Sequence, residues 1–278
     1  MVPHSFVRII GSAAHELPFI RMTLLEADGQ VDTILLAEAD FTHTGIQRER
    51  QLEVHALELG GLVTQSEFKY LPVTIGSRVR MESDRATDHH FNERLIRDAF
   101  TESYQLSDND VVIALDADEV VYRASYPYVL HMASKRHPLR TNVRLPMRQF
   151  YYRVNLLWEG LTFTSAVAGR VRDLRRSSVA WRDAGYLLSG FVGCHFSWQL
   201  TTEQMIEKLG NYAHNSDYGH LANAQVLEDA VRTRTYPFDP HREFKLRRLS
   251  PEEAAAVYPA SIAEVWQDLE HLVDSGEA

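Results

Sequence analysis

The sequence has very little cysteine and no excess of positive charge. Its single cysteine, Cys194, excludes an internal disulfide and a zinc site built from several thiolates, and this favours a reducing compartment. Lysine and arginine number 29 against 38 aspartate and glutamate residues, which gives a formal charge of −9. A chain of this charge has no general attraction for a polyanion, so we do not expect nucleic acid as a partner.

Long hydrophobic runs, linkers and repeats are also missing. No stretch reaches the roughly 18 uninterrupted apolar residues of a membrane span, and the N-terminus lacks the charged region and apolar core of a signal peptide. We therefore expect a cytoplasmic protein that does not enter a membrane. With 278 residues and 45% hydrophobic content, the chain can bury the core of a single domain over residues 1–278.

Strand patterns alternate with helix patterns in the first part of the chain. Residues 5–14, 30–40 and 68–75 are predicted to form strands, and residues 17–28 and 88–107 are predicted to form helices. This alternation is typical of an α/β domain with a mostly parallel central sheet flanked by helices. In such a sheet, the loops at the carboxyl ends of the strands form the ligand crevice.

The composition changes beyond residue 140. Residues 139–174 are rich in β-branched and aromatic side chains, as expected of antiparallel strands. Residues 190–214 predict a strand followed by a helix with an N-cap at Thr201 or Thr202, and residues 261–274 predict one more helix. We expect a smaller antiparallel β part in this C-terminal half.

The strongest strand signal ends in three acids. Five apolar residues, 111–115, are followed by Asp116, Asp118 and Glu119 within DNDVVIALDADEVVYRASYP. A turn at the end of this strand lets both aspartates face one crevice, where carboxylates can hold Mg²⁺ or Mn²⁺ against a diphosphate. The alternative is that these acids are ordinary solvated turn residues.

Two metal-dependent chemistries fit the segment LDADEV. In a haloacid-dehalogenase-like phosphatase, Asp116 would be the nucleophile and Asp118 the general acid. That interpretation also requires a later strand ending in paired acids, which the sequence lacks, and it expects the motif near the N-terminus. In a nucleotide-sugar glycosyltransferase of the GT-A type, the DxD motif holds a divalent ion on the diphosphate of the donor. The position in the chain favours this second interpretation.

Several blocks, in order, resemble glycosyltransferase family 17, the family of the β-1,4-mannosyl-glycoprotein β-1,4-N-acetylglucosaminyltransferase. They span roughly residues 15–240 and are HELPFIRMTLLEA, VDTILLAEADFTHTG, NERLIRDAF, DNDVVIALDADEV and GFVGCHFSWQLTTEQMIEKL. The most specific, GCHFSWQLTTEQMIEKL, is similar to the GWHxSW segment of the family followed by a Glu and a Lys. Cys194 stands where the family pattern has Trp.

The resemblance implies a GT-A-like, Rossmann-like fold and the transfer of a sugar to a hydroxyl acceptor with inversion. It implies a UDP-sugar donor, with UDP-GlcNAc favoured, and Mn²⁺ or Mg²⁺ as cofactor. The acceptor would be a small molecule or a glycan. Residues 1–135 would then form the nucleotide-sugar-binding half, residues 136–245 the acceptor- and metal-binding half, and residues 246–278 a C-terminal helical tail. A non-catalytic nucleotide-sugar-binding protein remains an alternative, and the sequence leaves the oligomeric state open.

The candidate metal ligands follow from the DxD motif and the resemblance. Asp118 is the expected ligand, and Asp116 would bind the ion through water or contact the donor. His195 alone would be interpreted as a packed core histidine, but many GT-A enzymes use a C-terminal histidine as a further ligand, and imidazole suits Mn²⁺.

The candidate donor-binding residues lie on five segments. Arg97 would hold a phosphate through its planar fork of donors or pair with Glu93 four residues earlier, and Lys208 would act as a point charge on the diphosphate or remain solvated. Glu38 would contact the nucleoside or stabilise the loop that follows it. The full set is Gly11, Ser12, Glu38, Asn92, Arg97, Asp116 and Lys208.

An inverting transfer also needs a base that takes the proton of the acceptor hydroxyl. The candidates are Glu203, Asp217 and Glu159. Glu203 has a second interpretation as the capping-box acid for Thr201 or Thr202, since a helix N-terminus lowers the pKa of a carboxylate.

Overall fold

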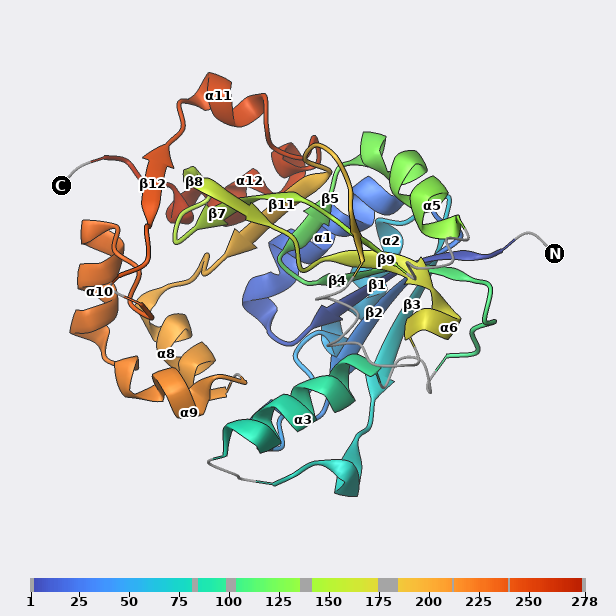
Figure 1. Cartoon of the computed structure of the whole chain (residues 1–278), viewed down its shortest axis with the longest axis horizontal. Helices are drawn as coiled ribbons and strands as arrows, with labels where there is room; N and C mark the ends of the chain where they lie inside the picture. The colour runs from blue at the N-terminus through green and yellow to red at the C-terminus, as the bar shows by residue number, and fades with distance from the viewer. Residues whose placement is uncertain are drawn as a thin grey trace.

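Two β-sheets with helices packed around them form the architecture of the protein (Figure 1). The computed structural model describes residues 3–81, 85–98, 104–135, 142–174, 185–211, 213–239 and 241–276. Within these ranges, a seven-stranded sheet is mostly parallel and a five-stranded sheet is mostly antiparallel. The predicted α/β fold, with a parallel central sheet and a smaller antiparallel part, is confirmed.

The larger sheet contains strands from both halves of the chain. They are β1 (Ser5–Gly11), β2 (Thr33–Ala39), β3 (Glu67–Val73), β4 (Val111–Asp116), β6 (Asn142–Arg144), β9 (Val167–Arg170) and β10 (Tyr186–Leu187). Their order is β10-β6-β9-β4-β1-β2-β3, and β4, β1, β2 and β3 run in parallel. β9 runs antiparallel to its neighbours β4 and β6.

Helices cover both faces of this sheet. They are α1 (Leu17–Ala27), α2 (Ala56–Gly61), α3 (Ala86–Asp98), α5 (Tyr126–Ser134) and α6 (Val171–Leu174). Val7 and Ile34 pack with Leu24 of α1 and Val129 of α5 on one face, and Val112 packs in a separate core with Ile96 and Val171 on the other. Burial on both faces explains why β2 and β4 are nearly continuous apolar runs.

The carboxyl ends of the parallel strands meet at one edge of the larger sheet. In the strand register, Gly11 pairs with Glu38 and Ile10 pairs with Asp116. The loops that follow β1, β2 and β4 therefore begin side by side. This edge is where an α/β sheet of this kind forms its ligand crevice.

The smaller sheet begins two residues after β4 ends. It contains β5 (Glu119–Val121), β7 (Met147–Tyr151), β8 (Leu156–Phe163), β11 (Gly193–Ser197) and β12 (Lys245–Arg248), in the order β12-β8-β7-β11-β5. β5 and β11 approach so closely that a side chain at Gly193 would collide with the carbonyl oxygen of Val120. His195 pairs in register with Glu119, so β11 lies directly beside the end of the DxD segment.

The remaining helices pack around the smaller sheet. They are α8 (Thr202–Asn211), α9 (Asn215–Tyr218), α10 (Ala224–Thr233), α11 (Pro251–Ala255) and α12 (Ile262–Leu269). Short 3-10 turns occur along the whole described chain, at Ala14–Glu16 (η1), Glu53–His55 (η2), Gly76–Arg78 (η3), Arg123–Ser125 (η4), Gly219–Leu221 (η5) and Glu270–Leu272 (η6). In Figure 1, α8, α9 and α10 lie together on the side away from α5. Val265 of α12 packs in one core with Met22 of α1.

Most of the predicted elements are present, with shorter bounds. The helix predicted over 88–107 corresponds to α3, which spans Ala86–Asp98. Residues 99–103 lie outside the described part of the chain, and residues 104–107 are not helical, so the predicted end of the helix is wrong. Across the described ranges, no helix has both the length and the apolar character needed to cross a bilayer. The division into functional halves at residues 135 and 245 stays a prediction.

Candidate functional site

A cavity of about 490 Å³ opens at the carboxyl edge of the larger sheet. The loops after β1, β2 and β4 form one side, and β11 and α8 form the other. Six of the residues singled out from the sequence line this cavity: Ser12, Arg97, Asp116, Asp118, His195 and Lys208. The structure therefore brings most of the predicted donor and metal residues together, although they come from five different segments.

Asp116 is bound to Arg97. The Nη1 and Nη2 atoms of Arg97 donate to the two carboxylate oxygens of Asp116 at 2.6 and 2.9 Å, and its Nε donates to Glu93 at 3.2 Å. Burial disfavours the charge on Arg97, but the facing carboxylates of Asp116 and Glu93 outweigh it and raise its pKa. The pairing with Glu93 that the sequence suggested is therefore present. The fork of donors that could hold a phosphate is occupied by both oxygens of Asp116, the first aspartate of the motif.

Asp118 faces His195 across the junction of the two sheets. The Oδ2 atom of Asp118 lies 3.5 Å from Nε2 of His195, and the imidazole packs against the ring of Phe163. Burial opposes ionisation of Asp118, but His195 and then Lys208 outweigh it and lower its pKa. The Nδ1 atom of His195 is buried without a hydrogen-bond partner among the described residues.

This pair fits a cation that is shared with a substrate. Among the described residues, no group of three or more His, Cys, Asp and Glu side chains is arranged to hold a metal ion. Asp118 and His195 offer one oxygen and one nitrogen as metal ligands, whereas both oxygens of Asp116 already accept hydrogen bonds from Arg97. Mg²⁺ commonly uses one or two protein ligands and completes its shell with water and phosphate oxygens, and Mn²⁺ accepts imidazole as well.

Positive side chains on both sides of the cavity could balance a diphosphate. The Nζ atom of Lys208 lies 5.4 Å from the centre of the Trp198 ring, on the α8 side. Arg48 lines the opposite side and donates to the carbonyl oxygens of Ala39 and Ser12 at 3.1 and 2.9 Å. Arg48 therefore fixes the loop that carries Ser12, whereas Lys208 is the cation expected to meet a ligand.

Three predicted donor residues do not line the cavity. Glu38 is fully buried and accepts from the backbone N–H groups of residues 51 and 52 and from the Tyr70 hydroxyl, so it anchors the loop after β2. Asn92 bridges the backbone of Arg80 and His43. A side chain at Gly11 would meet Leu52 and Ile20, so the absence of a side chain there suits core packing.

The three candidate bases also lie outside the cavity. Glu159 sits on β8 and pairs with Lys245 at 2.5 Å and Arg247 at 2.7 Å, of which Lys245 is the first cause of its lowered pKa. Asp217 lies 3.4 Å from His214 on the surface. Glu203 lies in the first turn of α8, where its own backbone N–H and then the Thr201 side chain lower its pKa, and Thr201 also exchanges capping bonds with Gln204.

Sequence reasoning missed two histidines that line the cavity. Burial, and then Lys208, lower the pKa of His15 to about 4, and burial lowers the pKa of His43 to about 4 as well. Both are therefore neutral at pH 7. The available signals were their positions, since His15 follows the first strand and His43 lies in the THTG loop after the second.

Glu16 was missed as well. It accepts from the backbone N–H groups of Ser12 and Ala13 at 2.5 and 3.0 Å and so holds the turn after β1 in place. Burial nevertheless raises its pKa.

The single thiol lies behind the site. Cys194 is fully buried on β11, with its Sγ atom 3.1 Å from the Tyr122 hydroxyl. Burial raises its pKa to about 12. A packed sulfur here occupies the place where the family 17 pattern has an indole.

Comparisons with known proteins identify no family for this chain. No protein-family model matches it, and no curated protein matches it. Among solved structures, it is similar to the crystal structure of 4-diphosphocytidyl-2C-methyl-D-erythritol synthase, with 10% sequence identity and a TM-score of 0.43 over 75% of this chain and 98% of that chain. A likeness of this strength carries no argument about chemistry, so function is inferred below from the geometry of the site.

Proposed function

We propose that the protein is a nucleotide-utilising transferase, and specifically a metal-dependent glycosyltransferase that moves a sugar from a UDP-sugar to a hydroxyl acceptor with inversion. The observation that carries this proposal is the Asp118–His195 pair, which faces a cavity at the carboxyl edge of a parallel sheet together with Lys208. UDP-GlcNAc is the favoured donor because of the sequence resemblance to family 17.

The residues of the cavity divide the work of holding a diphosphate donor. Asp118 and His195 would hold a divalent ion, which when bound neutralises charge on the departing diphosphate. Lys208 would add a point charge from α8. Ser12 would meet the nucleoside, because Glu16 and Arg48 fix its backbone at the cavity wall.

A base for the acceptor hydroxyl is better sought inside the cavity than among Glu203, Asp217 and Glu159. Glu207 lies on α8 one residue before Lys208 and lines the cavity. It makes no hydrogen bond or ion pair with another described residue, in contrast to Glu16, Glu93 and Glu119. We therefore assign the proton-accepting role to Glu207, where the carboxylate can reach a bound acceptor.

The phosphatase alternative is disfavoured by the state of Asp116. A nucleophilic aspartate needs an oxygen that can attack phosphorus, and both oxygens of Asp116 accept from the Arg97 fork. A transferase, in contrast, needs only Asp118 to remain accessible.

Ligand-dependent thermal stability tests the proposal. A ligand that binds only the folded state raises the unfolding temperature, so UDP should stabilise the wild-type protein when Mn²⁺ is present and not with EDTA. Asp118→Asn should abolish this metal-dependent shift. Asp229→Asn, an exposed aspartate paired with Arg232 on α10, is the matched control and should keep it.

Turnover assays then separate the classes of activity. Release of UDP from a panel of UDP-sugars, dependent on Mn²⁺ or Mg²⁺, is the expected result, with UDP-GlcNAc the best donor. Hydrolysis of p-nitrophenyl phosphate without any use of nucleotide sugars would favour the phosphatase. Stabilisation by UDP with no turnover of any donor would favour a binding protein.

A further inference from the structure

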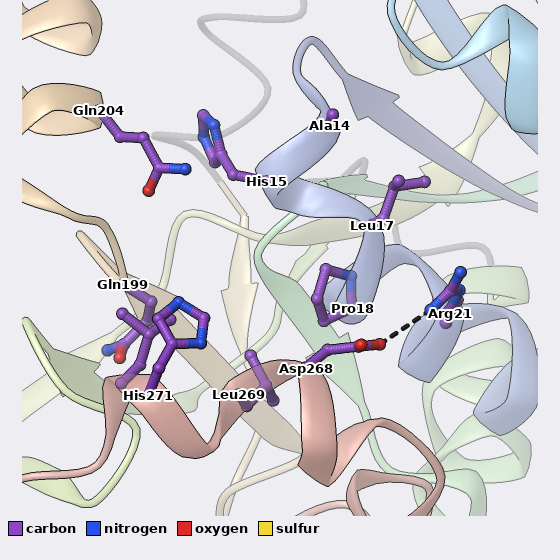
Figure 2. A pocket seen from close by; sticks show the side chains of 11 residues that line it. Ala14, His15, Leu17, Pro18, Arg21, Gln199, Gln204, Asp268, Leu269 and His271 are labelled. Atoms are coloured by element: carbon purple, nitrogen blue, oxygen red, sulfur yellow. Dashed lines mark hydrogen bonds and ion pairs between the residues drawn. The ribbon is translucent and has the colours of Figure 1, made fainter.

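A second cavity, of about 290 Å³, lies next to the first and plays no part in the donor site. The start of α1, the segment between β11 and α8, and the C-terminal α12–η6 region enclose it. Figure 2 shows Gln204 and His15 on its upper side and Gln199 and His271 on its lower side. Its volume is at the lower end of the range of small-molecule sites, about 300 Å³ and upward.

Gln199 gives this cavity an unsatisfied hydrogen-bond acceptor. The residue is only 2% exposed, and its Nε2 atom donates to the carbonyl oxygen of Ser197 at 3.3 Å. Its Oε1 atom is buried and has no hydrogen-bond partner among the described residues. A buried acceptor left unpaired carries a desolvation penalty, which a ligand hydroxyl that donates to Oε1 would remove.

The rest of the lining favours a neutral ligand with one apolar face. The charged residues Arg21 and Asp268 pair with each other at 2.8 Å, as Figure 2 shows, and so leave no net charge for a ligand. Leu17, Pro18 and Leu269 supply apolar surface. A sugar ring combines hydroxyl donors at its edge with C–H groups on its faces, and it matches this lining.

The second cavity adjoins the donor cavity along three segments. His15 lines both cavities. Ser197 lines the donor cavity and Gln199, two residues later, lines the second one. On α8, Lys208 lines the donor cavity and Gln204, about one helical turn earlier, lines the second one. A sugar bound against Gln199 would therefore lie beside the donor, close to Glu207.

We propose that the second cavity is the acceptor site and that it binds a neutral hexopyranose unit through Gln199. The role as an acceptor site rests on the proposed transferase function. Binding of a neutral sugar, in contrast, requires neither metal nor nucleotide. The two ideas can therefore fail separately.

Ligand-observed NMR of the full chain tests the site. The probes are methyl α-D-mannopyranoside and methyl β-D-glucopyranoside, with a methyl glucuronide as a charged comparison, all in EDTA and without nucleotide. We expect at least one neutral hexoside to bind and the glucuronide to bind more weakly. Gln199→Met should weaken hexoside binding about tenfold, the value of one hydrogen bond. Thermal stability should change little, because the acceptor that is removed is unpaired and the carbonyl oxygen of Ser197 keeps the backbone N–H of Tyr152 as a donor.

A matched control comes from the neighbouring strand β7. Gln149 is also buried with an unpaired Oε1 atom, but it lines neither cavity, so Gln149→Met should leave hexoside binding unchanged. Ala14→Phe provides a second test should Gln199→Met fail to fold. Ala14 is exposed at the rim, and a phenyl ring there should block the cavity without disturbing a core.

Each result decides the proposal. Weakened binding in Gln199→Met or Ala14→Phe, with normal binding in Gln149→Met, supports it. Absence of hexoside binding by the wild-type protein, or equal binding by wild type and a folded Gln199→Met, overturns it. Neither of these adverse results alters the Mn²⁺-dependent stabilisation by UDP, which tests the donor site alone.

Discussion

Acidic side chains near the junction of the two sheets are held in two different states. On the side of the parallel sheet, Asp116 is bound by the Arg97 fork and Glu38 by the loop after β2. On the side of the antiparallel sheet, Asp118 faces a histidine at 3.5 Å and lines the cavity. Acids that end neighbouring strands are thus divided between holding the fold together and meeting a ligand.

This comparison predicts that substitutions on the parallel side cost stability and substitutions on the antiparallel side cost binding. The largest expected effect is that of Arg97→Met, which removes the guanidinium group that donates to both carboxylate oxygens of Asp116. We expect a loss of about 3 kcal/mol in the free energy of unfolding, at the lower end for buried pairs because Asp116 is partly exposed. Urea denaturation measures it.

A double variant and a surface pair sharpen this first prediction. Arg97→Met combined with Asp116→Leu should recover part of the loss, since the charge of Asp116 is removed together with its cation, while Glu93 loses Arg97 and keeps His90. Arg232→Met breaks an exposed pair with Asp229 and should cost under about 1 kcal/mol. Equal losses for Arg97→Met and Arg232→Met would contradict the structural role of Asp116.

Glu38→Gln is the next largest expected effect. The carboxylate accepts from two backbone N–H groups and a tyrosine hydroxyl, and an amide would present its own N–H groups to these donors. We expect a loss of about 1–3 kcal/mol in unfolding free energy. Glu49→Gln, exposed in the same loop, should change it by less than about 0.5 kcal/mol.

His195→Leu tests the antiparallel side. Leucine can still pack against Phe163 but offers no nitrogen to a metal ion. The apparent affinity for UDP with Mn²⁺ should therefore fall at least tenfold, because loss of even an outer-shell partner typically lowers metal affinity by about 10–100-fold. Unfolding free energy should change little. Calorimetric titration measures the affinity and urea denaturation the free energy of unfolding, both against His220→Leu, an exposed histidine outside the cavity. An unchanged affinity would remove His195 from the metal site.

The last prediction concerns pH. His15 and His43 have pKa values of about 4 in the folded protein against 6.5 as a reference. Between these values the unfolded chain binds protons that the folded chain does not, so stability should fall as the pH drops from 6.5 to 4. His43→Gln should reduce this slope by up to one proton, about 1.4 kcal/mol per pH unit. Unfolding at pH 5 and pH 7 measures it, with His220→Gln as the control.

The sequence predicted the sheet well because its signals are local. The apolar run before Asp116 marks a strand covered on both faces. The six predicted residues that line the larger cavity lie at or just after strand ends, on helices beside them or, for His195, within β11. The sequence did not predict which carboxylate pairs with each positively charged side chain. Arg97 lies within one turn of Glu93, yet its fork goes to Asp116, 19 residues away.

The base candidates show the same limit over longer distances. Glu159 was chosen for its place beside Trp158, but its partners Lys245 and Arg247 come from β12, which no pattern in the sequence places beside β8. Glu207 gave no signal at all, because a glutamate on an amphipathic helix is usually solvated. The second cavity, likewise, depends on the packing of α1 against the C-terminal helix α12.

The buried thiol on β11 gives the molecule a built-in reporter. Because Cys194 is shielded within the smaller sheet and resists ionisation, an alkylating reagent should modify it only when that sheet opens. The rate at which the reagent labels the sulfur atom then reports the opening of the strand that carries His195. The same measurement applies to every variant described above without introducing a further cysteine.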